Sequence, residues 1–92
     1  MKHFDWNKEK NRWLIEKRGV GFGDIVNIIQ EGKDVLAVID SRNNKKYINQ
    51  RVFIVNINNY AYEVPFVEDE EKVFLKTIIP SRKSTKKYLT KL

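Results

Sequence analysis

The hydrophobic and polar positions in the first third of the chain recur at helical spacing. Asn7 is a good N-cap residue, the segment KEKNRWLIEKR after it has helical character, and Gly19 supplies a stop. A second helix is expected from about Phe22 to Ile29, with its end at Gly32. The residues expected to share one side of the first helix are Trp6, Trp13 and Leu14. The pattern predicts an N-terminal helical hairpin.

From Asp34 onward the pattern becomes that of strands. β-branched and aromatic residues dominate four runs, at 35–39, 47–57, 60–67 and 73–79. Asn58 and Asn59 tolerate positive φ and are expected to turn the chain between the second run and the third. A basic segment after Pro80 is expected to be helical from about Ser81. We therefore predict an α+β fold, in which the helical hairpin packs on one face of a four-stranded, mainly antiparallel sheet and a short basic C-terminal helix follows.

The size and composition of the chain limit its chemistry. Ninety-two residues leave room for one domain, expected to span 1–92, and 41% hydrophobic residues suffice for a core. With no cysteine and one histidine, thiolate zinc sites, cysteine nucleophiles and multi-histidine metal clusters are excluded, and we expect no cofactor. No run is long enough to span a membrane and no apolar signal segment opens the chain, so a cytoplasmic protein is expected.

The charge is strongly positive and unevenly spread. The net charge is +6, and the last 17 residues, from Lys76 to Leu92, hold six basic residues and no acidic one. Such a segment favours polyanionic ligands, because cations that neutralise phosphates release counterions. The four acids at 68–71 are interpreted as a solvated turn, since adjacent carboxylates without spaced ligand oxygens are weak evidence for a cation site.

Alternation in the predicted hairpin places Tyr60 and Tyr62 on one face of its second strand. If this face is exposed near Arg51 and Lys76, it offers stacking platforms beside phosphate-binding cations, as single-stranded RNA requires. The alternative is that both tyrosines lie at the edge of the core with their hydroxyls in water. For the basic segment 81–88, the alternative to a phosphate clamp is a solvated tail whose charge aids solubility.

Cleavage of RNA by its own 2′-hydroxyl needs a base for that proton, cations for the developing phosphorane charge and an acid for the 5′-oxygen. Lysine, arginine and tyrosine can fill these roles when neighbouring positive charge shifts their pKa values. A histidine pair is impossible here, and His3, beside the terminus, is expected to be a surface residue.

Two segments at opposite ends of the chain are similar to one known family. Residues 4–22 (FDWNKEKNRWLIEKRGVGF) follow the pattern F-x-W-D-x-x-K-x-x-x-N-x-x-K-H-G-V-x-F, and 78–87 (IIPSRKSTKK) resembles I-I-S-A-R-K-A-T-K-K. These patterns are those of BrnT-like toxins, in the RelE/ParE-like ribonuclease superfamily, so the chain resembles a divergent member. It departs from the family where Leu14 replaces an asparagine, Arg18 a histidine, Thr77 an arginine and Tyr88 an acidic residue.

The resemblance implies a RelE-like fold, a ribonuclease that arrests translation, and neutralisation by a cognate antitoxin. Such an antitoxin usually carries a ribbon-helix-helix DNA-binding part, and we expect its toxin-binding segment to be acidic. Lys10, Lys17 and Arg82 occupy matching positions of the family pattern, with Arg82 the strongest candidate for binding the phosphate or the transition state.

The leading hypothesis is therefore a metal-independent endoribonuclease that cleaves RNA, on or off the ribosome. Arg51, Lys76 and Arg82 are predicted to hold the scissile phosphate, and Tyr62 or Tyr88 to stack a base or move a proton. The predicted RNA-binding residues are Lys10, Lys17, Arg18, Lys46, Tyr60, Lys83, Lys86 and Lys87. The alternatives are a non-catalytic nucleic-acid-binding or repressor subunit that acts only with its partner, and a plain interaction domain for an acidic protein.

Overall fold

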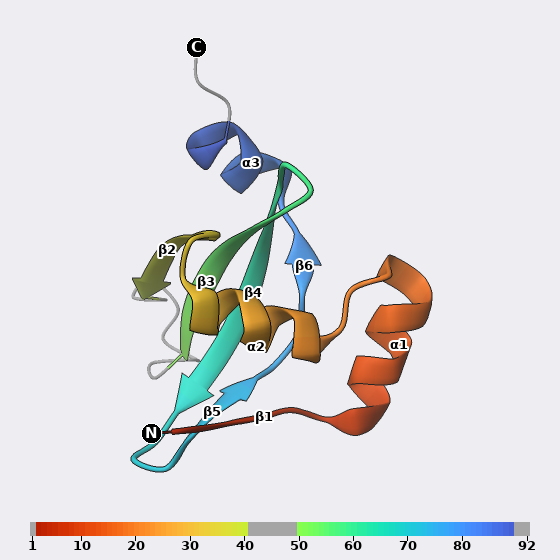
Figure 1. Ribbon diagram of the computed structural model, residues 1–92, viewed down its shortest axis with the longest axis vertical. Coiled ribbons are helices and arrows are strands. Elements are labelled where there is room, and N and C mark those ends of the chain that lie inside the picture. Colours follow the sequence, from red (N-terminus) through yellow and green to blue (C-terminus); the bar gives the residue numbers. More distant parts are fainter. Residues whose placement is uncertain (1, 41–49, 90–92) are drawn as a thin grey trace.

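The computed structural model describes residues 2–40 and 50–89, which form an α+β fold of three helices and a mixed sheet (Figure 1). In chain order the elements are β1 (His3–Asp5), α1 (Lys8–Arg18), α2 (Phe22–Glu31), β2 (Val35–Asp40), β3 (Gln50–Ile57), β4 (Tyr60–Glu68), β5 (Lys72–Leu75), β6 (Ile79–Pro80) and α3 (Arg82–Tyr88). The sheet order is β1-β5-β4-β3-β2, and β6 also pairs with β4. The predicted fold class is confirmed at this level.

The helices begin and end where the sequence predicts. The Asn7 side chain accepts a hydrogen bond from the backbone N–H of Lys10, and this bond caps α1. Gly19 and Gly32 follow α1 and α2 with φ of 71° and 82°, the left-handed conformation that glycine adopts without a steric penalty. Ser81 caps α3 by accepting from the N–H of Ser84.

The central hairpin is also as predicted. Asn58 and Asn59 have φ of 53° and 64°, and they join β3 to β4 in antiparallel register, with Ile57 opposite Tyr60. Paired positive φ values match the right-handed twist of the two strands. Residues 47–49 of the predicted run lie outside the described residues, and β3 begins at Gln50.

The prediction of four strands is wrong in two places, both on the same side of β4. β1 pairs with β5 in parallel, with Phe4 opposite Val73, although 69 positions separate them in the sequence. The run predicted at 73–79 divides into β5 and β6, because five residues of β4, from Phe66 to Tyr62, face six residues of the partner segment, from Leu75 to Pro80. One extra residue cannot be paired in a regular ladder, so the strand is interrupted.

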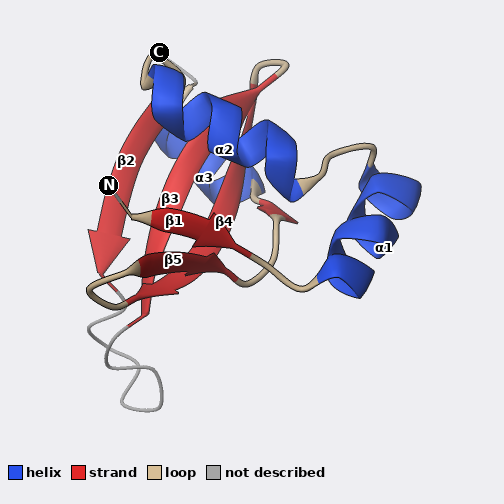
Figure 2. Ribbon diagram, turned by 60° about the horizontal axis from the view of Figure 1, so that its bottom comes forward, coloured by secondary structure: helices blue, strands red, loops and turns tan. Residues whose placement is uncertain are grey.

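The helices do not gather on one face of the sheet. Figure 2 shows α2 in front of the sheet, α3 behind it and α1 beside it. Phe22 and Ile25 of α2 are buried against the face that carries Val55 and Phe66. On the opposite face, Val52, Ile54 and Ala61 are buried, and Tyr88 and Leu89 pack against them. β3 has apolar residues in both alternations, so both of its faces need a cover.

The predicted helical hairpin is therefore corrected in detail. α2 covers the sheet alone, whereas α1 buries Leu14 as its one fully covered residue. Trp13, expected on the buried side, is 41% exposed. No helix of the described part is long and apolar enough to cross a membrane.

Candidate nucleic-acid interface

The helix α3 is held on β4 by its small hydroxyl residues. Ser81 is buried, and its N–H donates to the carbonyl of Ala61 at 3.0 Å. The hydroxyl of Thr85 accepts from the N–H of Ala61 at 2.8 Å, and that of Ser84 donates to the carboxylate of Glu63 at 3.0 Å. These bonds fix one side of the helix to the sheet, and the opposite side is left for solvent.

The exposed side of α3 is entirely cationic. It carries four exposed side chains, those of Arg82, Lys83, Lys86 and Lys87. The helix contains no acidic residue. Tyr88 is half-buried against the sheet, and the ammonium of Lys87 lies 5.3 Å from the centre of its ring. The predicted basic helix is therefore a fixed element that presents positive charge outward.

Tyr62 and Tyr88, the two tyrosines predicted to stack a base or move a proton, lie on opposite faces of the sheet. Tyr62 packs against the core beneath α2 and meets Tyr60 edge to face, with 5.9 Å between ring centroids. Tyr88 packs on the other face, against the buried cluster of Ile54. The described residues therefore do not form the open platform that was expected to hold Tyr60 and Tyr62 together with Arg51. Both hairpin tyrosines are half-buried, as in the edge-of-core alternative.

Arg51 is not brought together with Arg82. It pairs across the hairpin with Phe66, whereas Pro80, two residues before Arg82, pairs with Tyr62. These two positions on β4, Phe66 and Tyr62, are four residues apart, about 13 Å along the strand. Arg51 also lies on the β3 side of β4, and β6 lies on the other side.

The guanidinium of Arg51 is occupied by carboxylates. It bonds Asp40 at 3.0 Å and Glu68 at 3.1 Å, and its centre lies 5.8 Å from the ring centroid of Phe66. Lys2 donates to the same Glu68 at 2.9 Å. The hydrogen bond from Lys2, assisted by Arg51, lowers the pKa of Glu68 below its usual 4.5. These ion pairs join four segments at one end of the sheet.

Lys76 lies on the same edge of the sheet as β6. It is exposed in the segment between β5 and β6, and its backbone N–H donates to the carbonyl of Pro65 at 2.8 Å. The chain then passes buried Ile78 and reaches Pro80 and the start of α3. Of the three arginines and lysines predicted to hold the scissile phosphate, Lys76 and Arg82 therefore share an edge.

The predicted RNA-binding cations of α1 surround an exposed tryptophan. The ammonium of Lys10 lies 4.6 Å and the guanidinium of Arg18 5.3 Å from the ring centroid of Trp13. Arg18 also donates to the carbonyl of Ile78, which ties the end of α1 to the segment before β6. Lys17 is exposed in the last turn. The sequence places Trp13 on the buried side of the helix and so does not identify it as a binding residue; Lys10, three residues before it, is the one local signal for a cation beside the ring.

The acidic turn lies at the other end of the molecule from α3 (Figure 1). The carboxylate of Asp69 accepts from the N–H of Lys72 at 2.9 Å and of Glu71 at 2.8 Å, and these bonds lower the pKa of Asp69. Residues 69–71 form a turn, as predicted, whereas Glu68, expected in the same turn, ends β4 and binds Lys2 and Arg51. The described residues contain no cluster of acidic residues and histidine that could hold a metal ion.

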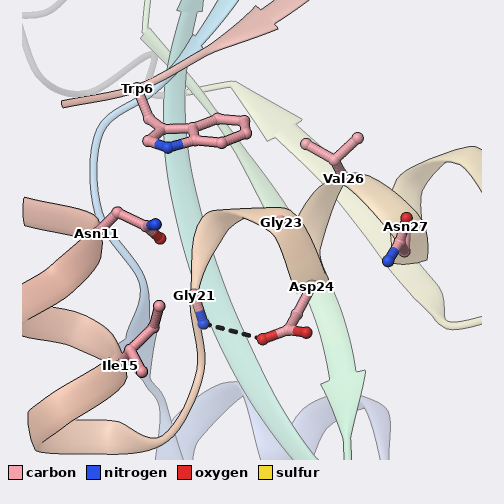
Figure 3. Close-up of a pocket in the computed structure, with 8 residues that line it drawn as sticks. All are labelled: Trp6, Asn11, Ile15, Gly21, Gly23, Asp24, Val26 and Asn27. Atoms are coloured by element: carbon pink, nitrogen blue, oxygen red, sulfur yellow. Dashed lines mark hydrogen bonds between the residues drawn. The ribbon is translucent and has the colours of Figure 1, made fainter. Parts of the chain in front are cut away.

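A hollow of about 530 Å³ lies between α1 and α2 (Figure 3). Trp6, Ile15 and Val26 line it with apolar atoms. Its polar groups hold the turn between the helices: Asn11 accepts from the N–H of Phe22 at 2.7 Å, and Asp24 from that of Gly21 at 3.0 Å. A Cβ atom at Gly21 would lie 2.8 Å from the side chain of Ile15, so a larger residue here would force that side chain to shift. We therefore interpret the hollow as part of the helix junction.

Lys46, the remaining predicted RNA-binding residue, lies outside the described residues. The chain matches no protein-family model, and none of the curated proteins or solved structures compared with it gives a significant match.

Proposed function

We propose that this protein is the toxin of a type II toxin–antitoxin pair and acts as a metal-independent endoribonuclease that inhibits translation. The resemblance of both chain ends to BrnT-like toxins is the starting point. One structural observation carries the proposal: α3 turns four cations and no carboxylate outward, while its hydroxyl residues hold it on β4. An ordered cationic element of this kind is suited to binding RNA phosphates.

The proposed chemistry is attack of an RNA 2′-hydroxyl on the adjacent phosphorus. A bond from the 2′-oxygen to phosphorus forms while the bond to the 5′-oxygen breaks, which leaves a 2′,3′-cyclic phosphate and a 5′-hydroxyl. Arg82 is proposed to stabilise the charge that develops on the phosphate oxygens, with Lys76 on the same edge. Tyr62 or Tyr88 moves a proton or stacks a base, and one site uses only one of them, because they lie on opposite faces.

Arg51 is not part of this proposed site. Its guanidinium is bonded to Asp40 and Glu68, and moving it to a phosphate would leave both carboxylates without this partner. We assign it to the ion pairs that join the strands.

A non-catalytic nucleic-acid-binding subunit is the second candidate. The separation of Arg51 from Arg82 favours it, since one of three predicted phosphate ligands is directed elsewhere. Such a subunit binds RNA or DNA through the same cations of α3, but it lacks a general acid and a general base and therefore does not cleave the strand.

The proposed partner is a cognate antitoxin with a ribbon-helix-helix DNA-binding part and an acidic toxin-binding segment. An acidic segment that covers α3 neutralises four cations and blocks the RNA surface at the same time.

One experiment separates these functions. The purified protein is incubated with single-stranded RNA in excess EDTA, with and without the antitoxin encoded beside it, and the product ends are identified. We expect cleavage with cyclic phosphate ends, its loss on addition of the antitoxin, and growth arrest when the protein is induced alone. Tight RNA binding without cleavage would assign the second candidate.

A further inference from the structure

An exposed tryptophan between two cations is an unusual feature of α1. Seven of the eleven residues of this helix are charged, yet Trp13 presents 41% of its surface to solvent. The fold does not need it as a core residue, because Leu14 fills that role. Lys10 and Arg18 lie against its ring at 4.6 Å and 5.3 Å from the centroid.

From this geometry we infer that Trp13 is a base-stacking residue, and that with Lys10 and Arg18 it forms a nucleotide subsite for single-stranded RNA. An indole offers a flat surface that any unpaired base can stack on, and adjacent cations bind the phosphates on either side of that base. The inference rests on the proposed function and extends it, because it names the strandedness of the ligand and a second contact on another helix.

Arg18 connects this subsite to the cations of α3. One of its N–H groups donates to the carbonyl of Ile78, and arginine has four further N–H donors. From Ile78 the chain passes along β6 to Arg82, four residues later, which is at most about 13 Å of extended backbone. Figure 1 shows α1 beside β6, with α3 beyond the far end of β6. A short oligonucleotide can therefore contact Trp13 and α3 together.

The charges around Trp13 favour RNA over an apolar protein surface as the occupant. Covering Lys10 and Arg18 with an apolar protein surface removes two charges from water without supplying partners for them, which is costly. RNA brings a flat apolar base and phosphates in one ligand. Both side chains are long, so each can shift from the ring to a phosphate when a base arrives.

The test measures the affinity of a short single-stranded RNA by fluorescence anisotropy over a range of salt concentrations. Trp13→Ala should weaken binding about 5- to 150-fold, the effect of losing one stacked base, with the salt dependence unchanged. Lys10→Gln should flatten the slope of log affinity against log salt by about 0.7, because one phosphate contact is lost. Trp13→Phe should retain most of the affinity, since it keeps an aromatic face.

Two controls make the test specific. Ile15→Ala removes another exposed apolar side chain of α1, one that is 51% exposed, and should leave RNA affinity unchanged. In a Trp6→Phe protein, Trp13 is the sole tryptophan, and its emission should be quenched by single-stranded RNA and not by duplex RNA.

The outcomes separate the inference from the function on which it rests. If the unchanged protein binds no RNA, the proposed function fails and the subsite fails with it. If the unchanged protein binds RNA and folded Trp13→Ala binds it equally well, the proposed function stands and the subsite is wrong. Equal loss of affinity after Ile15→Ala would also overturn stacking, because it would indicate a general apolar surface.

Discussion

The backbone at Arg82 is held in place, while its charged side chain is exposed to solvent. The residue before it is buried and bonded to β4, so the guanidinium starts from a defined position at the sheet edge. If it stabilises the transition state, Arg82→Ala should raise the barrier to cleavage at saturating RNA by about 2 to 4 kcal/mol. Folding stability should change by no more than about 0.5 kcal/mol, because the side chain is exposed. Single-turnover cleavage and thermal melting measure the two effects.

Lys83 provides a matched control for Arg82, since it is the next exposed cation of the same helix turn. Lys83→Ala should weaken binding and leave the cleavage rate at saturation nearly unchanged. Arg82→Lys should recover binding better than cleavage, because lysine keeps the charge and loses the bidentate geometry. A folded Arg82→Ala protein that cleaves RNA at the normal rate would remove Arg82 from the site.

The lowered pKa of Glu68 makes the free energy of unfolding depend on pH. Its pKa is lowered in the folded protein by Lys2 and Arg51, so it contributes stability above its usual pKa of 4.5 that is lost as the pH falls through the lowered value. Glu68→Gln should therefore destabilise the protein at pH 7, by up to about 1 kcal/mol for a partly exposed pair network. The difference from the unchanged protein should shrink towards pH 3. Urea denaturation at both pH values tests this.

Glu70 is the control for this experiment, as an exposed acid of the turn that follows Glu68, for which the described part of the chain shows no ion pair. Glu70→Gln should change stability little at either pH. If Glu68→Gln costs the same at pH 3 as at pH 7, its effect comes from shape or packing and not from charge.

Single residues show why some of the site could be predicted and some could not. The basic helix α3 is predicted correctly because its four cations lie within six residues of sequence and the Ser81 cap is local. Arg51 was assigned to the phosphate because its partners, Asp40 and Glu68, are 11 and 17 residues away and only the sheet register brings them together. Lys10 is a local signal for a cation beside Trp13, but the exposure of the ring depends on how α1 lies relative to the sheet, which the sequence around it does not determine.

At the scale of elements, local signals succeeded and long-range pairing was missed. Caps at Asn7, Gly19 and Gly32 and the turn at Asn58 act over a few residues, so the sequence around them is sufficient. The strand β1 has only three residues and exists because β5 lies beside it. The break between β5 and β6 follows from one residue of mismatch against β4 and leaves no trace in composition. β3 has apolar residues at both its odd and its even positions, and this pattern could have indicated that a second element, α3, covers the other face of the sheet.

For the whole molecule, charge is divided between its ends. Helices α1 and α3 carry nine of the eighteen lysines and arginines and two of the twelve acids, so the rest of the chain is close to neutral. Three acids, at 69–71, form the turn between β4 and β5, and Glu68 ends β4 beside them, away from α3 (Figure 1). Such a dipolar distribution orients the molecule towards a polyanion with α3 leading.

This distribution predicts the salt dependence of RNA binding. If Lys83, Lys86 and Lys87 each neutralise one phosphate of a single strand, replacing all three by glutamine should flatten the slope of log affinity against log salt by about 2. Affinity should fall most at low salt, where counterion release contributes most. Replacing Lys8, Lys33 and Lys72, which are exposed elsewhere on the molecule, removes the same net charge and serves as the control. Equal effects of the two triple variants would mean that net charge alone attracts RNA, whereas a change confined to the α3 variant locates the phosphate contacts on that helix.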